Sequence, residues 1–232
     1  MKSFKWLLFF TCFTLTLSAQ KLHEDYLTVN LLKPIDPFFP RINAGYVFDM
    51  KNGYGIGANV GFGHETWSPF NTEEEPKINY RFREFRLEFI KFTERSKNLT
   101  EYLALEAFYL EHTETRINDS YAPDSEIRLE FDSANYERTK FGINAKAGIF
   151  FSLLSQFGVN CYGGLGLRLR ENRYTDVVNP REDENFDGEF FSILADPIIR
   201  TYEREGTVVG LNLTMGVNIF LKLRKPQTGL SD

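Results

Sequence analysis

Residues 209 to 223 decide the fold of this chain, and they read Val-Gly-Leu-Asn-Leu-Thr-Met-Gly-Val-Asn-Ile-Phe-Leu-Lys-Leu. All eight odd positions are large and apolar, and the residues between them are Gly, Asn, Thr, Gly, Asn, Phe and Lys. With 42% hydrophobic residues in the chain, eight apolar residues at eight odd positions would arise by chance in roughly one stretch in a thousand. A β-strand has this period of two, so the stretch predicts a strand with one apolar and one polar face.

Seven further segments show the same alternation of apolar and polar residues. In the clearest of them, Val159, Leu165 and Leu167 face one way, and Asn160 and Arg168 face the other. The sequence therefore predicts an all-β chain of eight strands, or ten if part of the last long link also pairs. The seven segments cover residues 27–31, 42–50, 54–63, 84–89, 103–109, 142–151 and 157–170.

The links between these segments differ in length. Lys51-Asn52-Gly53 is a three-residue hairpin loop in which Gly53 is expected to adopt the left-handed conformation. Residues 97–99 and 154–156 are also short links, and the first link, 33–40, is brief. Long, polar, acidic loops are expected near 64–77, 112–136 and 170–205. Short turns at one rim and long loops at the other are typical of an antiparallel up-and-down transmembrane β-barrel.

The start of the chain indicates export. Lys2 and Lys5 precede an apolar stretch, and small residues precede a cleavage point before Gln20, so residues 1–19 are a predicted signal peptide. Residues 20–224 are then the barrel, and they include no apolar run of about 18 residues that could form a transmembrane helix. Without the signal, 25 basic and 32 acidic residues remain, a net charge of about −7. This charge disfavours nucleic acid as a partner.

A soluble eight-stranded barrel, such as a lipocalin, is the structural alternative. Such a barrel buries its apolar face inside and exposes a polar face rich in Lys, Glu, Thr and Ser. Here the polar face is rich in Gly and Asn, with charges of both signs. Small residues suit the crowded interior of a narrow barrel, so the sequence favours the membrane barrel.

The chain resembles a family at several points. The end of the signal, Ser18-Ala19-Gln20, the Gly-rich hairpin over 44–57 and the closing strand from Gly210 are similar to small outer-membrane β-barrel proteins of Bacteroidota, within the OmpA/OmpX-like porin superfamily. This resemblance implies the bacterial outer membrane as the location, outer-membrane lipid or lipopolysaccharide as surroundings, and the barrel-assembly machinery as a partner during insertion. The chain departs from the pattern in its polar tail, 225–232, which follows the last strand.

Six charged residues lie at polar positions of the alternating segments, and these are the candidate site residues. An uncompensated charge inside a narrow barrel is costly to bury, so we expect the acids and bases to pair. The favoured interpretation is an ion-pair network that fills a closed barrel, and a conducting pore is the alternative. The six residues are Glu84, Arg86, Glu88, Glu106, Lys146 and Arg168.

Catalytic motifs are not apparent in the sequence. Beyond the signal the histidines are His23, His64 and His112, without HExxH spacing and without a Gly-x-Ser-x-Gly serine nearby. We therefore expect no enzyme and no cofactor.

One acidic loop matches part of a metal-binding motif. Asp183, Asn185 and Asp187 match the first three oxygen ligands of a calcium loop, and Gly188 matches its turn. Leu194 stands where the bidentate acid is required, so the loop is an incomplete site and no metal is expected.

Two functions remain open from sequence. The first is a closed structural or interaction barrel whose long loops contact the envelope or an extracellular partner. The second is a small, porin-like diffusion channel. Nothing in the sequence names a ligand or a solute.

Overall fold

The computed structural model describes most of the chain after the predicted signal. The signal 1–19, the acidic loop with Asp183, Asn185 and Asp187, and the tail 225–232 lie outside the described residues. The described ranges are 24–36, 38–50, 52–67, 78–96, 98–123, 128–182 and 204–224.

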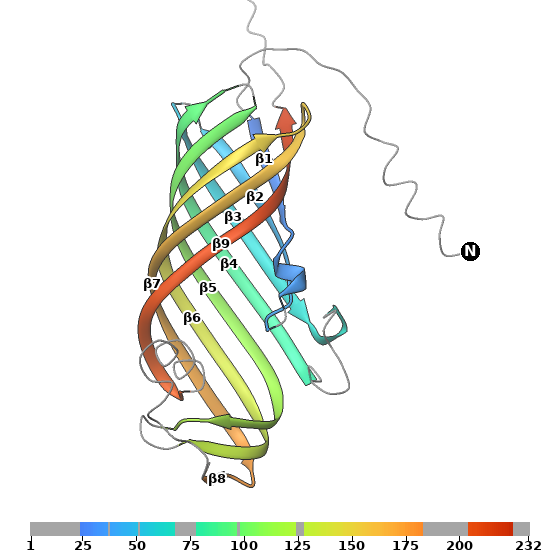
Figure 1. Ribbon diagram of the computed structural model, residues 1–232, viewed down its shortest axis with the longest axis vertical. Coiled ribbons are helices and arrows are strands. Elements are labelled where there is room, and N and C mark those ends of the chain that lie inside the picture. The colour runs from blue at the N-terminus through green and yellow to red at the C-terminus, as the bar shows by residue number, and fades with distance from the viewer. Residues whose placement is uncertain are drawn as a thin grey trace, which may run out of the picture.

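The eight predicted strands are all present, and their hydrogen bonds run through a closed, antiparallel, barrel-like ring (Figure 1). Neighbours in sequence pair, and the ring closes because β1 pairs with β9. The ring strands are β1 (Glu24–Asn30), β2 (Ile42–Met50), β3 (Tyr54–His64), β4 (Ile78–Arg95), β5 (Leu99–Tyr121), β6 (Leu129–Ser152), β7 (Phe157–Val178) and β9 (Gly206–Arg224). Short 3-10 helices η1 (Lys33–Ile35) and η2 (Glu65–Trp67) follow β1 and β3.

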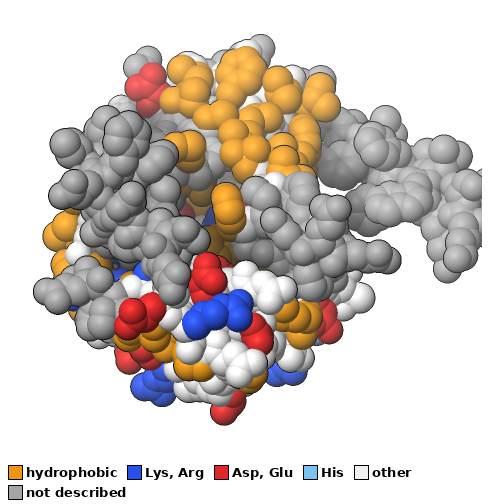
Figure 2. Space-filling model, turned by 60° about the horizontal axis from the view of Figure 1, so that its bottom comes forward, with side chains coloured by type: hydrophobic (Ala, Val, Ile, Leu, Met, Phe, Trp, Pro, Cys, Tyr) orange, Lys and Arg blue, Asp and Glu red, His pale blue; other side chains and the backbone are white. Residues whose placement is uncertain are grey.

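The structure confirms the predicted facing of the strands. On β9, Leu211 and Leu213 are 77% and 66% exposed, whereas Asn212 and Thr214 are 4% and 8% exposed. The apolar positions of the alternating strands therefore lie outside the ring, and the polar positions lie inside. Figure 2 shows apolar side chains gathered on the outer wall and charged side chains around the end nearest the viewer.

Two of the predicted long loops are wrong, because strands occupy much of them. Within 112–136, β5 continues to Tyr121 and β6 already begins at Leu129, so only the residues between them connect the strands. Within 170–205, β7 continues to Val178. The extensions carry polar residues on both faces, so their alternation is weak in the sequence. The two-residue β8 (Arg181–Glu182) pairs with β6 and does not join the ring.

The turns at the opposite end are short. Asn52 and Gly53 both have positive φ, 80° and 82°, in the hairpin between Met50 and Tyr54. Glycine adopts this conformation without a steric cost, which confirms the role predicted for Gly53. Beyond His64, residues 68–77 are not described, so the long link over 64–77 is seen only at its ends. In the described ranges, no helix is long and apolar enough to cross a membrane.

Adjacent glycines on β7 provide a test of the packed interior. A Cβ at the inward Gly164 would lie 2.4 Å from the carbonyl oxygen of Ala145, whereas a Cβ at the outward Gly163 would meet nothing within 4 Å. We expect Gly164→Ala to destabilise the protein by about 1–3 kcal/mol through overpacking and Gly163→Ala to be tolerated. Denaturant titrations followed by circular dichroism measure both, and equal stabilities would contradict this packing.

Candidate functional site

Five of the six predicted charged residues meet inside the ring. Arg86 donates from Nε to Glu84 Oε1 at 2.7 Å, and its Nη1 lies 2.6 Å from Glu106 Oε1. Lys146 Nζ lies 2.8 Å from both Glu106 Oε2 and Glu88 Oε1. These contacts form one chain of ion pairs, Glu84–Arg86–Glu106–Lys146–Glu88, which we call the charge network. All five side chains are buried.

Strand register explains why the charge network needs its lysine. The pairing of β4 with β5 sets Glu88 directly opposite Glu106. Like charges at opposed positions repel, and Lys146 from β6 lies between them and offsets that repulsion. Asn144 adds a hydrogen bond from its Nδ2 to Glu106 Oε1 at 2.7 Å. Arg86 of β4 also pairs with Glu106, so cations from two strands compensate the opposed acids.

The other candidates lie apart from the charge network. Arg168, the sixth predicted residue, is half-buried on the inner face of β7, opposite glycines of β6 and β9. His64 is exposed and contacts Thr66, whereas His112 is buried inside the ring, so the two histidines do not share a site. No group of three or more His, Cys, Asp or Glu side chains in the described part of the chain is arranged to hold a metal ion.

Two cations of the site could not be found from sequence. After β1, the chain folds into the ring, where Lys33 Nζ lies 2.8 Å from Glu84 Oε2 and Arg41 Nε lies 2.9 Å from the same oxygen. The side chain of Asn30 starts this fold, because its Oδ1 accepts hydrogen bonds from the backbone N–H groups of Leu32 and Lys33. Arg41 N donates to Lys33 O at 3.0 Å and closes the loop. We call residues 31–41 the inward loop. Residues in a loop do not alternate with a period of two, so alternation does not indicate that Lys33 and Arg41 face inward.

Amide side chains fill much of the remaining interior. Asn30 donates to Asn218, which donates to Asn160, and Asn160 donates to the hydroxyl of Tyr102. On the other side of the charge network, Asn212 donates to Asn144. Buried amides need partners, and these hydrogen bonds satisfy them across five strands without adding charge.

Aromatic side chains close the interior near the short turns. Tyr26 and Phe150 stack with ring centroids 4.6 Å apart, and Phe220 meets both rings edge-on. Ile90, Phe92 and Tyr102 belong to the same buried cluster. We call this cluster the aromatic plug. It leaves the charge network enclosed on that side.

A second aromatic group lies beyond the charge network. It lies toward the end of the ring where β5, β6 and β7 extend furthest, which we call the long-strand end. His112 packs among Phe39, Tyr80, Phe82 and Tyr136, with centroid distances between 5.2 and 5.9 Å. Burial lowers the pKa of His112, although Glu114 Oε2 lies 3.4 Å from its Nε2. The imidazole is therefore neutral at pH 7, and its surroundings are those of a packed core residue.

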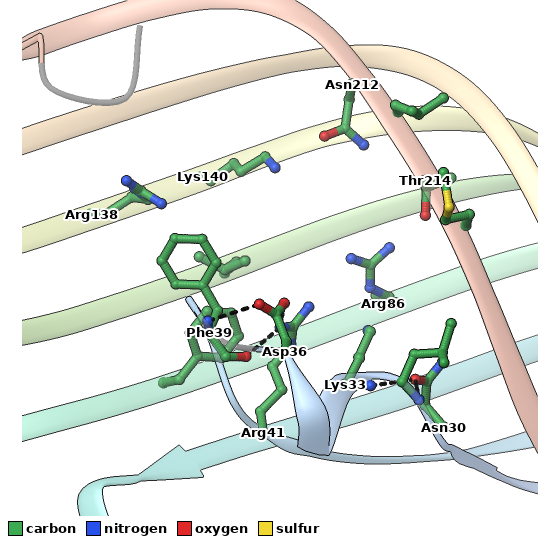
Figure 3. Close-up of a pocket in the computed structure, with 15 residues that line it drawn as sticks. Asn30, Lys33, Asp36, Phe39, Arg41, Arg86, Arg138, Lys140, Asn212 and Thr214 are labelled. Carbon is green, nitrogen blue, oxygen red and sulfur yellow. Dashed lines mark hydrogen bonds and ion pairs between the residues drawn. The ribbon is translucent and has the colours of Figure 1, made fainter. Parts of the chain in front are cut away.

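Between the charge network and this second group lies a basic cavity of about 370 Å³ (Figure 3). The inward loop forms one wall, β9 forms the opposite wall, and side chains of β4, β5 and β6 form the back. Among the described residues that line it, Asp36 is the one carboxylate. The basic lining residues are Lys33, Arg41, Arg86, Arg138 and Lys140.

Comparisons with known proteins do not assign this site. No protein-family model matches the chain, and no curated protein matches its sequence. The family resemblance noted in the sequence therefore stays a prediction, and the chemistry of the interior has to be inferred from its geometry.

The charge network can be tested at its central acid. Glu106→Ala removes the acid that Arg86 and Lys146 share, so we expect a loss of about 3–5 kcal/mol in unfolding free energy. Glu171, which faces Arg173 at 3.8 Å on the exposed surface, is the control. Glu171→Gln should cost less than about 1 kcal/mol. Denaturant titration of both variants measures the difference, and a Glu106→Ala variant as stable as the control would contradict the network.

Proposed function

We propose that this protein is a bacterial outer-membrane β-barrel with a closed interior, whose role is structural or depends on contacts made by its long-strand end. The observation that supports this most is the distribution of polarity. Large apolar side chains such as Leu105, Ile143 and Leu165 are exposed on the outer face, while Glu, Lys, Arg and Asn side chains are buried inside. A soluble barrel has the opposite arrangement. The proposal includes no catalytic step.

The outer apolar face ends abruptly, as expected at the surface of a bilayer. On β5, exposed Leu105 and Tyr109 are followed on the same parity by Glu111 and Thr113. On β6, Phe141 is preceded by Thr139, Glu137 and Asn135. A transmembrane strand needs about 9–11 residues, whereas β5 has 23. The remaining length of β5, β6 and β7 would then project out of the membrane.

The projecting end supports an interaction role. Its interior holds an aromatic cluster of Tyr121, Phe131 and Tyr174, which Tyr136 joins to the group around His112. A cluster of this kind stiffens strands that no lipid surrounds, and it presents the hairpin between β5 and β6 to the exterior. Contacts with lipopolysaccharide or an extracellular protein would be made here.

Membrane depth can be tested with two substitutions on one strand and one face. Leu165 lies mid-way along the apolar band of β7, and Thr175 is exposed ten residues further on. We expect Leu165→Arg to cost about 2–4 kcal/mol in a lipid-refolding titration and Thr175→Arg to cost about 0–1 kcal/mol. Sedimentation with the outer membrane and a heat-dependent gel mobility should accompany this. A soluble periplasmic protein that tolerates both substitutions equally would reject the proposal.

Planar-bilayer recordings separate the closed barrel from a diffusion channel. We expect the unmodified protein to conduct little or nothing, because the aromatic plug and the charge network lie in series. A combined Glu106→Ser, Lys146→Ser and Phe220→Ser variant should open steps of conductance, provided that its gel mobility shows a folded protein. The surface variant Glu171→Ser with Arg173→Ser is the control and should stay closed. A large, steady conductance from the unmodified protein would support the channel instead.

A further inference from the structure

The wall of the ring has a gap beside β9. This strand pairs with β7 from Leu221 to Gly206, but its pairing with β1 ends at Asn218, opposite Asn30. One further hydrogen bond runs from Leu31 N to Val217 O at 2.9 Å. Within the described residues, positions 206–216 of β9 therefore have a neighbouring strand on one side only. In Figure 1, β9 turns away from η1 below this point.

The gap exists because β1 has seven residues whereas β9 has nineteen. The chain leaves β1 at Asn30 and enters the ring as the inward loop, so in the described ranges no strand continues along this edge of β9. Backbone groups of Val217 point toward β1, and alternation gives Met215 and Leu213 the same orientation. In a bilayer, backbone N–H and C=O groups at such an edge need polar partners.

The basic cavity opens beside this gap. Leu213 and Met215 are lining residues of the cavity and are also exposed on the outer face. Asn212 and Thr214, which alternate with them, face inward (Figure 3). The opening is therefore apolar on its outer side and polar on its inner side, as a binding site for an amphipathic molecule would be.

The charges of the cavity favour an anion. Lys33, Arg41 and Arg86 share Glu84, and Arg41 also contacts Asp36. Lys140 reaches the cavity from β6, where its Nζ lies 5.5 Å from the centroid of the Phe108 ring. It forms no ion pair with any acid in the described part of the chain. Basic side chains thus outnumber carboxylates, and a phosphate group would offset the excess with charge-assisted hydrogen bonds.

We propose that the cavity binds the phosphate headgroup of an anionic phospholipid that enters sideways between β9 and the inward loop. The acyl chains stay outside, against Leu213 and Met215, and polar headgroup atoms satisfy the edge of β9. A volume of about 370 Å³ suits a headgroup, since it lies near the lower limit of small-molecule sites, about 300 Å³. This inference rests on the proposed location in a membrane.

Native mass spectrometry of the folded protein in maltoside micelles tests the site. Phosphatidylglycerol and phosphatidylcholine with identical acyl chains are offered together, and we expect about tenfold preference for phosphatidylglycerol. Lys140→Gln and Thr214→Glu each reduce the positive charge of the cavity, and each should lower the preference at least fivefold. The matched controls are Arg173→Gln and Thr175→Glu, which make the same kinds of change on the exposed face of β7 and should keep the preference.

The outcomes distinguish a lipid phosphate from a soluble phosphate. They also distinguish failure of the lipid site from failure of the proposed function. Equal retention of both lipids, or a preference that the two cavity variants leave unchanged, overturns the inference. Displacement of phosphatidylglycerol by equimolar inorganic phosphate also overturns it, in favour of a soluble anion. Gel mobility is recorded for every variant, and two single cavity variants are used so that misfolding of one leaves the other informative. A protein that stays soluble without detergent contradicts the proposed function itself, whereas a micelle-folded protein without lipid preference contradicts the lipid site alone.

Discussion

The arrangement of the interior depends on one constraint, which is that the glutamates that project into the centre of a narrow ring need opposite charges there. Glu84, Glu88 and Glu106 project inward from adjacent strands, and Arg86 and Lys146 join them into a single network. Removal of any one partner leaves a charge in a place that water reaches poorly. Strand register and side-chain size have to satisfy this constraint together.

Glycine makes room for the charge network. Each glycine concerned lies on β3, directly opposite a glutamate of β4. A Cβ at Gly61 would lie 3.0 Å from Glu84 Oε2, and a Cβ at Gly57 would lie 3.3 Å from the Cβ of Glu88. The smallest residues of one strand thus face the long acidic side chains of the next. The Gly-rich strand β3 and the charged strand β4 therefore pack as one unit.

The inward loop links the charge network to the irregular part of the wall. By entering the ring, it brings Lys33 and Arg41 to Glu84 and adds two cations to one acid. The same turn at Asn30 ends β1 early, so that among the described strands this edge of β9 has no second neighbour. The excess of positive charge and the gap therefore have a common structural origin, which is why the basic cavity and the gap lie side by side.

The sequence by itself determined the strands, their facing and the five residues of the charge network. Alternation is a local property, so Leu211 and Asn212 are assigned to opposite faces without knowledge of any partner strand. Counting such segments predicted eight strands, or ten if part of the last long link paired, and the ring has eight. Glu84, Arg86, Glu88, Glu106 and Lys146 were found in the same way, because each lies within an alternating segment.

Only the tertiary structure decided which charges meet and where the ring is incomplete. Lys146 contacts Glu88, 58 residues away in sequence, and this contact depends on the registers of three strands, which alternation within one strand does not specify. Lys33 and Arg41 lie in a loop, where no periodicity assigns a direction to a side chain. The extensions of β5, β6 and β7 carry polar residues outside and a mixture of polar and aromatic residues inside, so their alternation is weak and strand pairing extends them. The gap beside β9 results from unequal lengths of β1 and β9, which become neighbours only when the ring closes.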